Sequence, residues 1–174
     1  MNRSSLPRRS LAAGFLLLLL ASCASPAAEL ENLDAFPKAQ LEIVSGKNKH
    51  VFDIWIADTQ PRQMQGLMFV RDLPADRGMI FEYGEARILS MWMKNTYIPL
   101  DMLFIDAQGH IASIAENTTP HSLKNISSSQ PVTAVLEVKA GEVKRRQIKR
   151  GDSVVIRQRT VVAPIPTSDT KTAP

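Results

Sequence analysis

The sequence predicts a mainly β fold, in the form of a small closed or partly closed barrel-like domain with one or two short helices. Two observations predict it. From residue 39 to residue 159, short apolar runs alternate with turn signals rich in Gly, Pro, Asn and Asp. Several of these runs also alternate apolar and polar residues with the two-residue period of a half-buried strand. A β-sandwich is the alternative, because it produces the same pattern.

Two strands and a helix are expected to open the domain. Residues 40–44 form a short apolar run that a Ser-Gly pair closes, and residues 50–57 alternate on the strand period. The next four residues, 58–61, read Asp-Thr-Gln-Pro, which places a capping side chain before a proline in the first helical turn. A short helix is therefore expected at residues 61–66, with its terminal glycine as a left-handed stop.

The middle of the domain is expected to be a succession of strands. Residues 78–83 (GMIFEY) lie between a proline and a glycine, and residues 88–93 and 100–106 flank a polar turn. The sequence Ala-Gln-Gly at 107–109 is typical of a hairpin turn, so the chain should return as a strand at 110–116.

The last elements follow the same logic. Residues 132–139 (VTAVLEVK) are rich in β-branched residues and predict a strand. A short amphipathic helix is expected at residues 141–148. The pair Gly151-Asp152 then turns the chain into a last strand at residues 153–159.

The N-terminus carries an export signal, which we assign to residues 1–22. Three arginines precede the apolar run at residues 11–21, which is too short to span a bilayer comfortably. The run leads into Leu20-Ala21-Ser22-Cys23, which resembles the lipobox of bacterial lipoproteins. That resemblance implies cleavage before Cys23 and lipidation of its thiol. The alternative is an ordinary cleavable signal, for which Ala24, Ala27 and Ala28 could supply the cleavage site.

Lipidation predicts where the protein lies and how the chain is divided. Cys23 would anchor the domain to a bacterial membrane facing the periplasm, and the outer membrane is favoured because no aspartate follows Cys23. A soluble periplasmic or secreted protein is the alternative. Residues 23–38 are expected to be a flexible tether, 39–159 a single β-rich domain, and 160–174 a disordered tail rich in Pro and Thr.

The charge balance argues against nucleic acid as a partner. Three of the 21 basic residues precede Cys23, so 21 − 3 = 18 remain beside 17 acidic residues, none of which precedes Cys23. A mature chain so close to neutrality lacks the basic surplus of a nucleic-acid-binding domain. The one basic cluster, at residues 144–150, is expected to be the solvated face of the second helix.

Motifs of known enzyme chemistry are missing from the sequence. It contains no G-x-S-x-G, P-loop, G-x-G-x-x-G, C-x-x-C or H-E-x-x-H motif, and its one cysteine is assigned to lipid. The three histidines are expected at solvated turns or strand edges. The six methionines that follow Cys23 could bind Cu(I), but they lie among apolar residues, which favours core packing. We therefore expect no cofactor and no metal.

The stretch MWMKNTYIPLD at residues 91–101 is the strongest candidate site. Asp101 interrupts an apolar strand, and Glu137 does the same in the strand at 132–139. Asp101 could accept hydrogen bonds from turn amides or pair with Lys94, as a structural lock, and the spacing favours this reading. Alternatively, the candidate ligand-binding residues converge on the mouth of a pocket; they are Trp92, Lys94, Asn95, Asp101 and Glu137.

Four segments of the chain resemble the domain-of-unknown-function 192 family, whose members are small, often exported domains. They are QGLMF at 65–69, GMIF at 78–81, residues 92–106, and residues 135–152 with their VLE, AG and GD motifs. The resemblance covers residues 41–156 and implies a compact, barrel-like β domain. It implies no catalytic residue. It marks as motif positions the residues Trp92, Met93, Lys94, Asn95, Pro99, Asp101 and Glu137.

Three functions remain open on the sequence alone. The first, which is favoured, is a non-enzymatic envelope lipoprotein that binds a small polar ligand or an envelope partner. The second is a hydrolase or lyase acting on an envelope glycan with Asp101 and Glu137 as paired carboxylates, which must share one cleft. The third is a purely structural envelope protein, in which the motif closes the fold.

Overall fold

The computed structural model describes residues 30–160 of the chain, with side chains described up to residue 157. Within this range the helical segments are η1 (Leu33–Ala35), α1 (Gln60–Gln65) and α2 (Glu142–Arg145). The strands are β1 (Lys38–Ser45), β2 (Asn48–Ala57), β3 (Arg77–Arg87), β4 (Ser90–Met91), β5 (Leu100–Ile105), β6 (Ile111–Ala115), β7 (Ile126–Ser127), β8 (Val132–Lys139) and β9 (Ser153–Thr160).

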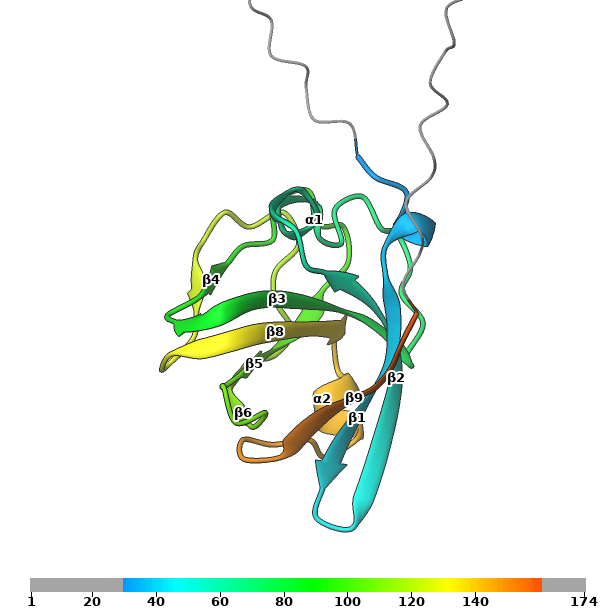
Figure 1. Ribbon diagram of the computed structural model, residues 1–174. Helices are drawn as coiled ribbons and strands as arrows, with labels where there is room; N and C mark the ends of the chain where they lie inside the picture. Colours follow the sequence, from blue (N-terminus) through cyan, green and yellow to red (C-terminus); the bar gives the residue numbers. More distant parts are fainter. Residues whose placement is uncertain (1–29, 161–174) are drawn as a thin grey trace, which may run out of the picture.

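Seven of the strands form one sheet that curls into a half-barrel (Figure 1). Their order is β6-β5-β8-β3-β2-β1-β9, and only the pair β2 and β3 is parallel. The two edges approach each other at one end, where His110 beside β6 bridges Ser153 of β9. The predicted mainly β, partly closed barrel-like fold is thus confirmed. The sandwich is excluded because the seven-stranded sheet curls on itself and the second sheet is only the two-stranded pair β4-β7.

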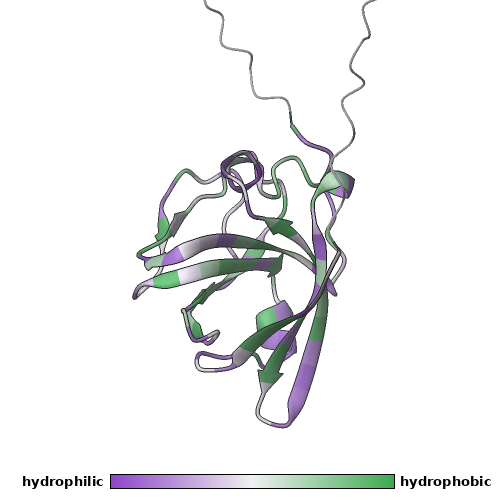
Figure 2. Ribbon diagram, in the orientation of Figure 1, coloured by the Kyte–Doolittle hydropathy of each residue, from purple (hydrophilic) through white to green (hydrophobic). Residues whose placement is uncertain are grey.

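Both faces of the sheet are buried over much of its area. One apolar cluster includes Leu103 and Leu136 of the sheet together with Val143 and Ile148 around α2. The other includes Met79 and Met102 of the sheet, Met91 of β4, and Leu67 and Leu73 from the segment that follows α1. Apolar colouring therefore runs along strands that lie in the middle of the sheet (Figure 2). Successive side chains of one strand point to opposite faces and pack in different apolar clusters. The register of the strands therefore determines the cluster in which each side chain lies.

Most strand predictions are confirmed, and two elements are shorter than predicted. The strand expected at 88–93 is limited to Ser90–Met91, because Trp92 begins an irregular segment that continues to Pro99. The helix expected at 141–148 is a single turn, Glu142–Arg145. Its neighbour Gln147 adopts a left-handed conformation with φ 55°, which a regular helix does not accommodate.

The packed chain begins upstream of residue 39. Phe36 is fully buried, and Glu31 forms an ion pair with Arg62 of α1 at 2.8 Å. The expected signal peptide, Cys23 and the tail beyond Thr160 lie outside the described residues. Within residues 30–160, no helix is long and apolar enough to cross a membrane.

Candidate functional site

A pocket of about 260 Å³ lies on the face of the sheet that α1 covers. It is formed by α1, β3, β4, the segment after β4, and β8. Its floor is made of buried side chains, namely Leu67, Phe81, Met91, Thr96 and Glu137. Its rim includes exposed residues, among them Met64, Trp92 and Lys94. We call this hollow the Glu137 pocket.

Local sequence explains how α1 reaches the pocket. The helix begins after Thr59 with a proline in its first turn, as predicted, and ends at Gly66, whose N–H donates to Arg62. Gly66 has φ 50° and ψ −138°, which is outside the left-handed helical stop that was expected. A Cβ atom at this position would lie 3.0 Å from the Phe81 ring. Glycine thus lets α1 approach β3 closely, next to the pocket floor.

The segment after β4 supplies the rim. The Lys94 ammonium lies over the Trp92 ring, 5.3 Å from its centroid, and Trp92 is 47% exposed. Asn95 adopts φ 56°, so the chain turns there, as predicted, and its carbonyl accepts from the N–H of Phe69. The Asn95 side-chain amide lies 3.8 Å from the sulfur of Met68, which lines the pocket. Asn95 therefore supports the pocket through Met68.

Glu137 is the ionisable group on the pocket floor. Its side chain lies on β8 between Leu136 and Val138 and is only 4% exposed. Burial raises the pKa of its carboxyl to about 8. Within residues 30–160 no hydrogen bond or ion pair satisfies this carboxyl. Tyr83, which also lines the pocket, donates its hydroxyl to the sulfur of Met91 at 3.6 Å. Burial, and then the nearby Glu137, raise the pKa of Tyr83.

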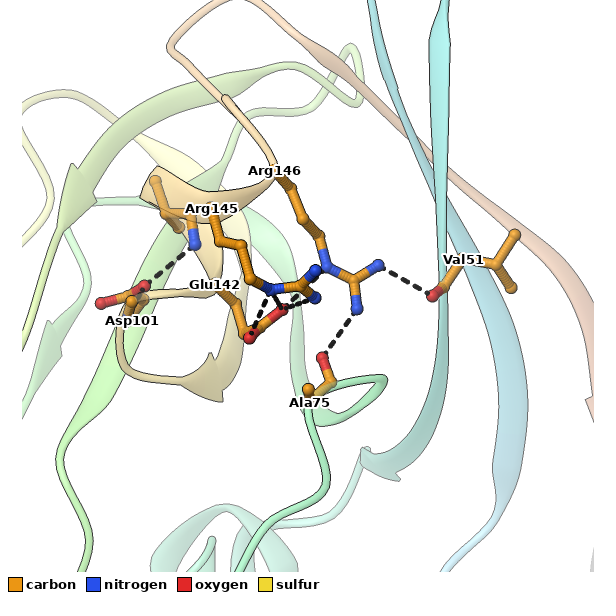
Figure 3. Close-up of polar contacts among 8 residues, drawn as sticks. Val51, Ala75, Asp101, Glu142, Arg145 and Arg146 are labelled. Carbon is orange, nitrogen blue, oxygen red and sulfur yellow. Dashed lines mark hydrogen bonds and ion pairs between the residues drawn. The ribbon is translucent and has the colours of Figure 1, made fainter.

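Asp101 lies on the opposite face of the sheet and is fully buried. In the register of β5 and β8, Asp101 is opposite Val138, whereas Glu137 is opposite Met102. The Asp101 carboxylate accepts from the backbone N–H groups of Asn117 (2.8 Å), Gly141 (2.9 Å) and Val143 (3.1 Å). One of these bonds to the start of α2 is visible in Figure 3. Asp101 is thus a structural lock that ties two loops to β5.

This geometry corrects two hypotheses. Asp101 and Glu137 are on different faces of the sheet, so they cannot act as paired carboxylates on one substrate, and that route to a glycan hydrolase is wrong. The five candidate residues also do not converge on one mouth. Trp92, Lys94 and Glu137 line the Glu137 pocket, whereas Asp101 does not.

Part of the basic cluster at residues 144–150 is held in internal contacts, whereas Lys144 and Arg150 are exposed. Buried Glu142 pairs with both Arg145 and Arg146 (Figure 3). Hydrogen bonds from Arg145 in the first place, and also from Arg146, hold the pKa of Glu142 below its usual range. Arg146 also donates to the carbonyl of Ala75 at 2.8 Å and lies over the Phe52 ring at 4.2 Å. The expectation of a solvated face therefore fails for Arg146, because this side chain joins α2 to β2.

The expectation that all six methionines belong to the core is confirmed for the buried Met91 and the three named next, and it is wrong for Met64. Met79, Met93 and Met102 are fully buried. Met64 is 64% exposed on α1, and it lines the Glu137 pocket together with Met68 and Met91. Within the described residues, no cluster of three or more His, Cys, Asp or Glu side chains is arranged to hold a metal ion.

The pocket residues that the sequence did not reveal are Tyr83, Met64 and Met68. Each looked like an ordinary strand or helix residue, because the signal that joins them is spatial. One clue was present in α1, since Met64 follows Arg62 and Gln63 in a helix with little apolar periodicity. A methionine on an otherwise polar helix indicates either that this side chain is exposed to solvent or that it lines a binding site.

The fold and the pocket define a class, which is a single-domain, half-barrel β protein with a small pocket over one face of its sheet. The sequence profile of the DUF192 family, described as "Uncharacterized ACR", matches residues 42–156. The chain belongs to this family. Comparison with curated proteins gives no match.

Two of the solved structures that are similar to the protein come from bacteria. One, from Sinorhizobium meliloti and described as a candidate transcription regulator, is 41% identical with a TM-score of 0.69, covering 70% of this chain and 95% of its own. The other, from Novosphingobium aromaticivorans, is described as a protein of unknown function. It is 31% identical with a TM-score of 0.69, covering 75% of this chain and 94% of its own.

Proposed function

We propose that the protein is an exported, lipid-anchored envelope protein whose domain binds a small polar ligand in the Glu137 pocket. The binding proposal rests on one observation about Glu137. This residue lines the pocket and is only 4% exposed, and its carboxyl has no polar partner within residues 30–160. Burying a carboxyl without a partner costs free energy. Its neighbours on β8 are apolar, so a role in folding alone would be served better by another apolar side chain.

A small ligand fits this pocket better than a protein partner does. The flat surface of a protein partner contacts only exposed groups. Glu137 is not exposed, because it lies on the floor of the pocket beneath the rim residues Met64 and Trp92. A compact molecule can enter and place a polar group against the carboxyl. The catalytic alternative lacks support, because the carboxylate proposed as the partner of Glu137 is on the other face of the sheet.

The description of one relative as a candidate transcription regulator does not favour nucleic acid as a partner here. Nucleic-acid binding needs cations that are free to contact phosphates. In the basic cluster Arg145 and Arg146 pair with Glu142, and Lys149 pairs with Asp152 at 3.1 Å, which leaves Lys144 and Arg150 as the cluster's exposed cations without an ion pair within residues 30–160. The near-balance of charge after Cys23 supports the same proposal.

The binding proposal is tested by a thermal-shift screen of small polar compounds against the full-length protein. We expect at least one compound to raise the melting temperature of the wild type and to lose that effect in Glu137→Gln. Asp53→Asn is the matched control, because Asp53 is an exposed carboxylate on β2 away from the pocket. Ligands whose effect survives in Glu137→Gln, or a screen without any hit, would overturn the proposal.

A further inference from the structure

The Glu137 pocket contains two ionisable groups of opposite kind, a carboxyl and an ammonium, that do not pair with each other. Glu137 is on the floor and Lys94 is on the rim, and both line the same hollow. Within residues 30–160, neither side chain forms an ion pair. The contact of the Lys94 ammonium is with the face of the Trp92 ring, at 5.3 Å from its centroid. The pocket thus has an unpaired carboxyl on its floor and an unpaired ammonium on its rim.

Most other polar side chains of the pocket are already engaged, and Gln60, which also lines the pocket, is exposed. Gln63 donates to the carbonyl of Glu82 at 2.6 Å, and Gln65 exchanges hydrogen bonds with the backbone of Glu31. Thr96 donates to the carbonyl of Lys94 at 3.3 Å. A ligand that needs several neutral hydrogen-bond partners, such as a sugar, would therefore find few of them. Apart from the exposed Gln60, the Glu137 carboxyl and the Lys94 ammonium are the polar side-chain groups that remain.

The walls between these two charges are apolar and aromatic. Met64, Met68 and Met91 supply flexible thioether side chains, and Tyr83 and Trp92 supply rings. Methionines adapt to irregular apolar surfaces, so they suit a short hydrocarbon segment. Aromatic faces attract ammonium groups, and the position of Lys94 over Trp92 is an example within this pocket.

We propose that the pocket binds a small zwitterion, with its ammonium group at Glu137 and its carboxylate at Lys94. This proposal rests on the proposed function and names the class of ligand. A simple anion would place its charge in a pocket whose floor is a carboxyl, and a simple cation would face the Lys94 ammonium at the rim. A zwitterion matches both ends and covers the apolar wall with the carbons between its charges.

The zwitterion model predicts a dependence on pH. A carboxyl whose pKa is about 8 is largely protonated at pH 6, so an ammonium ligand must displace its proton. The ionised fraction rises from roughly 1% at pH 6 to roughly 50% at pH 8, so affinity should rise roughly fiftyfold. The other titratable groups that line the pocket are Tyr83 and Lys94. Burial raises the pKa of Tyr83, which keeps its hydroxyl neutral across this window.

The experiment is an NMR titration of the full-length protein with ¹³C-labelled methionine methyl groups. The probes are ω-amino acids from glycine to 6-aminohexanoate, each matched with the alkylamine and the carboxylic acid of equal length. We expect one chain length to bind at least tenfold tighter than both of its matched compounds. Its binding should shift the methyl signals of Met64, Met68 and Met91 and strengthen from pH 6 to pH 8.

Two variants separate the ends of the ligand. Lys94→Gln should reduce the affinity for the zwitterion to that for the matched amine, and Glu137→Gln should reduce it to that for the matched acid and remove the pH dependence. Lys47→Gln and Asp53→Asn, which change exposed residues on β2 and its preceding turn, should bind as the wild type does.

The outcomes distinguish this inference from the proposed function. An amine, acid or neutral compound that binds as tightly as every ω-amino acid would overturn the zwitterion model while preserving a ligand-binding pocket. Failure of every ω-amino acid to bind would overturn it as well. If the broader thermal-shift screen also gives no ligand that depends on Glu137, the proposed function itself is refuted.

Discussion

Asp101 and Glu137 lie on neighbouring strands, one register position apart, and their carboxyls meet opposite surroundings. The Asp101 carboxylate accepts hydrogen bonds from three backbone N–H groups, of which that of Val143 belongs to a buried residue. Glu137 accepts none within residues 30–160, and its carboxyl has a pKa raised to about 8 by burial. The carboxyl of Asp101 is therefore a structural lock, because its hydrogen bonds are made within the fold. The carboxyl of Glu137 is a candidate ligand contact, because it has no such hydrogen bonds.

Replacing Asp101 with asparagine tests the lock. One carboxylate oxygen, which accepts from both Gly141 and Val143, or the other, which accepts from Asn117, becomes an NH₂ group that cannot accept. We expect Asp101→Asn to lower the free energy of unfolding by about 2–4 kcal/mol. Asp53→Asn, the same change at an exposed strand position, should stay within about 0.5 kcal/mol. Urea unfolding measures both, and equal effects would contradict the lock.

Glu137 should make the stability of the protein fall as pH rises. Its pKa is raised from an ordinary value of 4.5 to about 8, so between these values the folded protein holds a proton that the unfolded chain releases. The stabilisation from this group is complete below pH 4.5 and is lost as pH rises through 8. The change is on the order of 3–5 kcal/mol.

Glu137→Gln removes this titration while preserving the shape of the side chain. Urea unfolding at pH 5 and pH 8 should show a smaller loss for the variant, which becomes the more stable protein at pH 8. Other groups that titrate in this window, such as His50, are present in both proteins, so the difference reports Glu137. Parallel pH curves for the two proteins would show that Glu137 does not titrate as its burial implies.

The short helix α2 illustrates what element prediction could and could not reach. The sequence indicated a helix at 141–148, but only one turn forms. A single turn has little stability of its own, so partners far away in sequence must hold it. Those partners are Asp101, which accepts from its first turn, and the contacts of Arg146 with Val51 and Ala75 (Figure 3). No pattern in the sequence of residues 141–148 itself predicts these contacts with distant residues.

The arginines of α2 allow a matched test of these contacts. Both bind Glu142, but the Arg146 side chain is 13% exposed and reaches β2, whereas the Arg145 side chain is 59% exposed. Lysine cannot reproduce the planar, multiply bonded guanidinium. We expect Arg146→Lys to cost about 1–3 kcal/mol of unfolding free energy and Arg145→Lys less than about 1 kcal/mol. Thermal or urea unfolding that ranks the two variants in the opposite order would contradict this role for Arg146.

The fold as a whole was predictable because strand length and turn chemistry are local properties of the sequence. The face on which each strand residue lies was less predictable, because both faces of the central strands are buried. Alternation then no longer distinguishes core from solvent. For this reason the sequence placed Asp101 and Glu137 at one site, while the register of β5 and β8 separates them. Glu137 was found because a polar group within an apolar run is visible without the register, and Trp92 and Lys94 were found because they belong to the stretch MWMKNTYIPLD at residues 91–101.

The two ends of the domain differ in their relation to the proposed lipid anchor. Cys23 precedes Glu31 by 31 − 23 = 8 residues, which span at most about 29 Å when extended. Glu31 bonds to Gln65, which lines the Glu137 pocket. The turn between β1 and β2, which contains Lys47, lies at the far end of the domain from α1 (Figure 1). An anchor at Cys23 would therefore keep the α1 end, with the pocket, near the membrane.

The anchor and the orientation can be tested on the same preparation. Intact mass of the membrane-extracted protein should correspond to a chain that begins at an acylated Cys23, and Cys23→Ser should release the protein from the membrane.

The orientation is tested by fluorescence quenching. Cys23 is the only cysteine, and its thiol is blocked when it is acylated. A thiol-reactive fluorophore on Met64→Cys or on Lys47→Cys therefore labels one known position. Quenchers in the lipid headgroups should quench the label at position 64 more strongly than the label at position 47. A mature chain that begins elsewhere would refute the anchor, and equal quenching would refute the orientation alone, because a lipid tether limits the distance to Glu31 without aligning the domain.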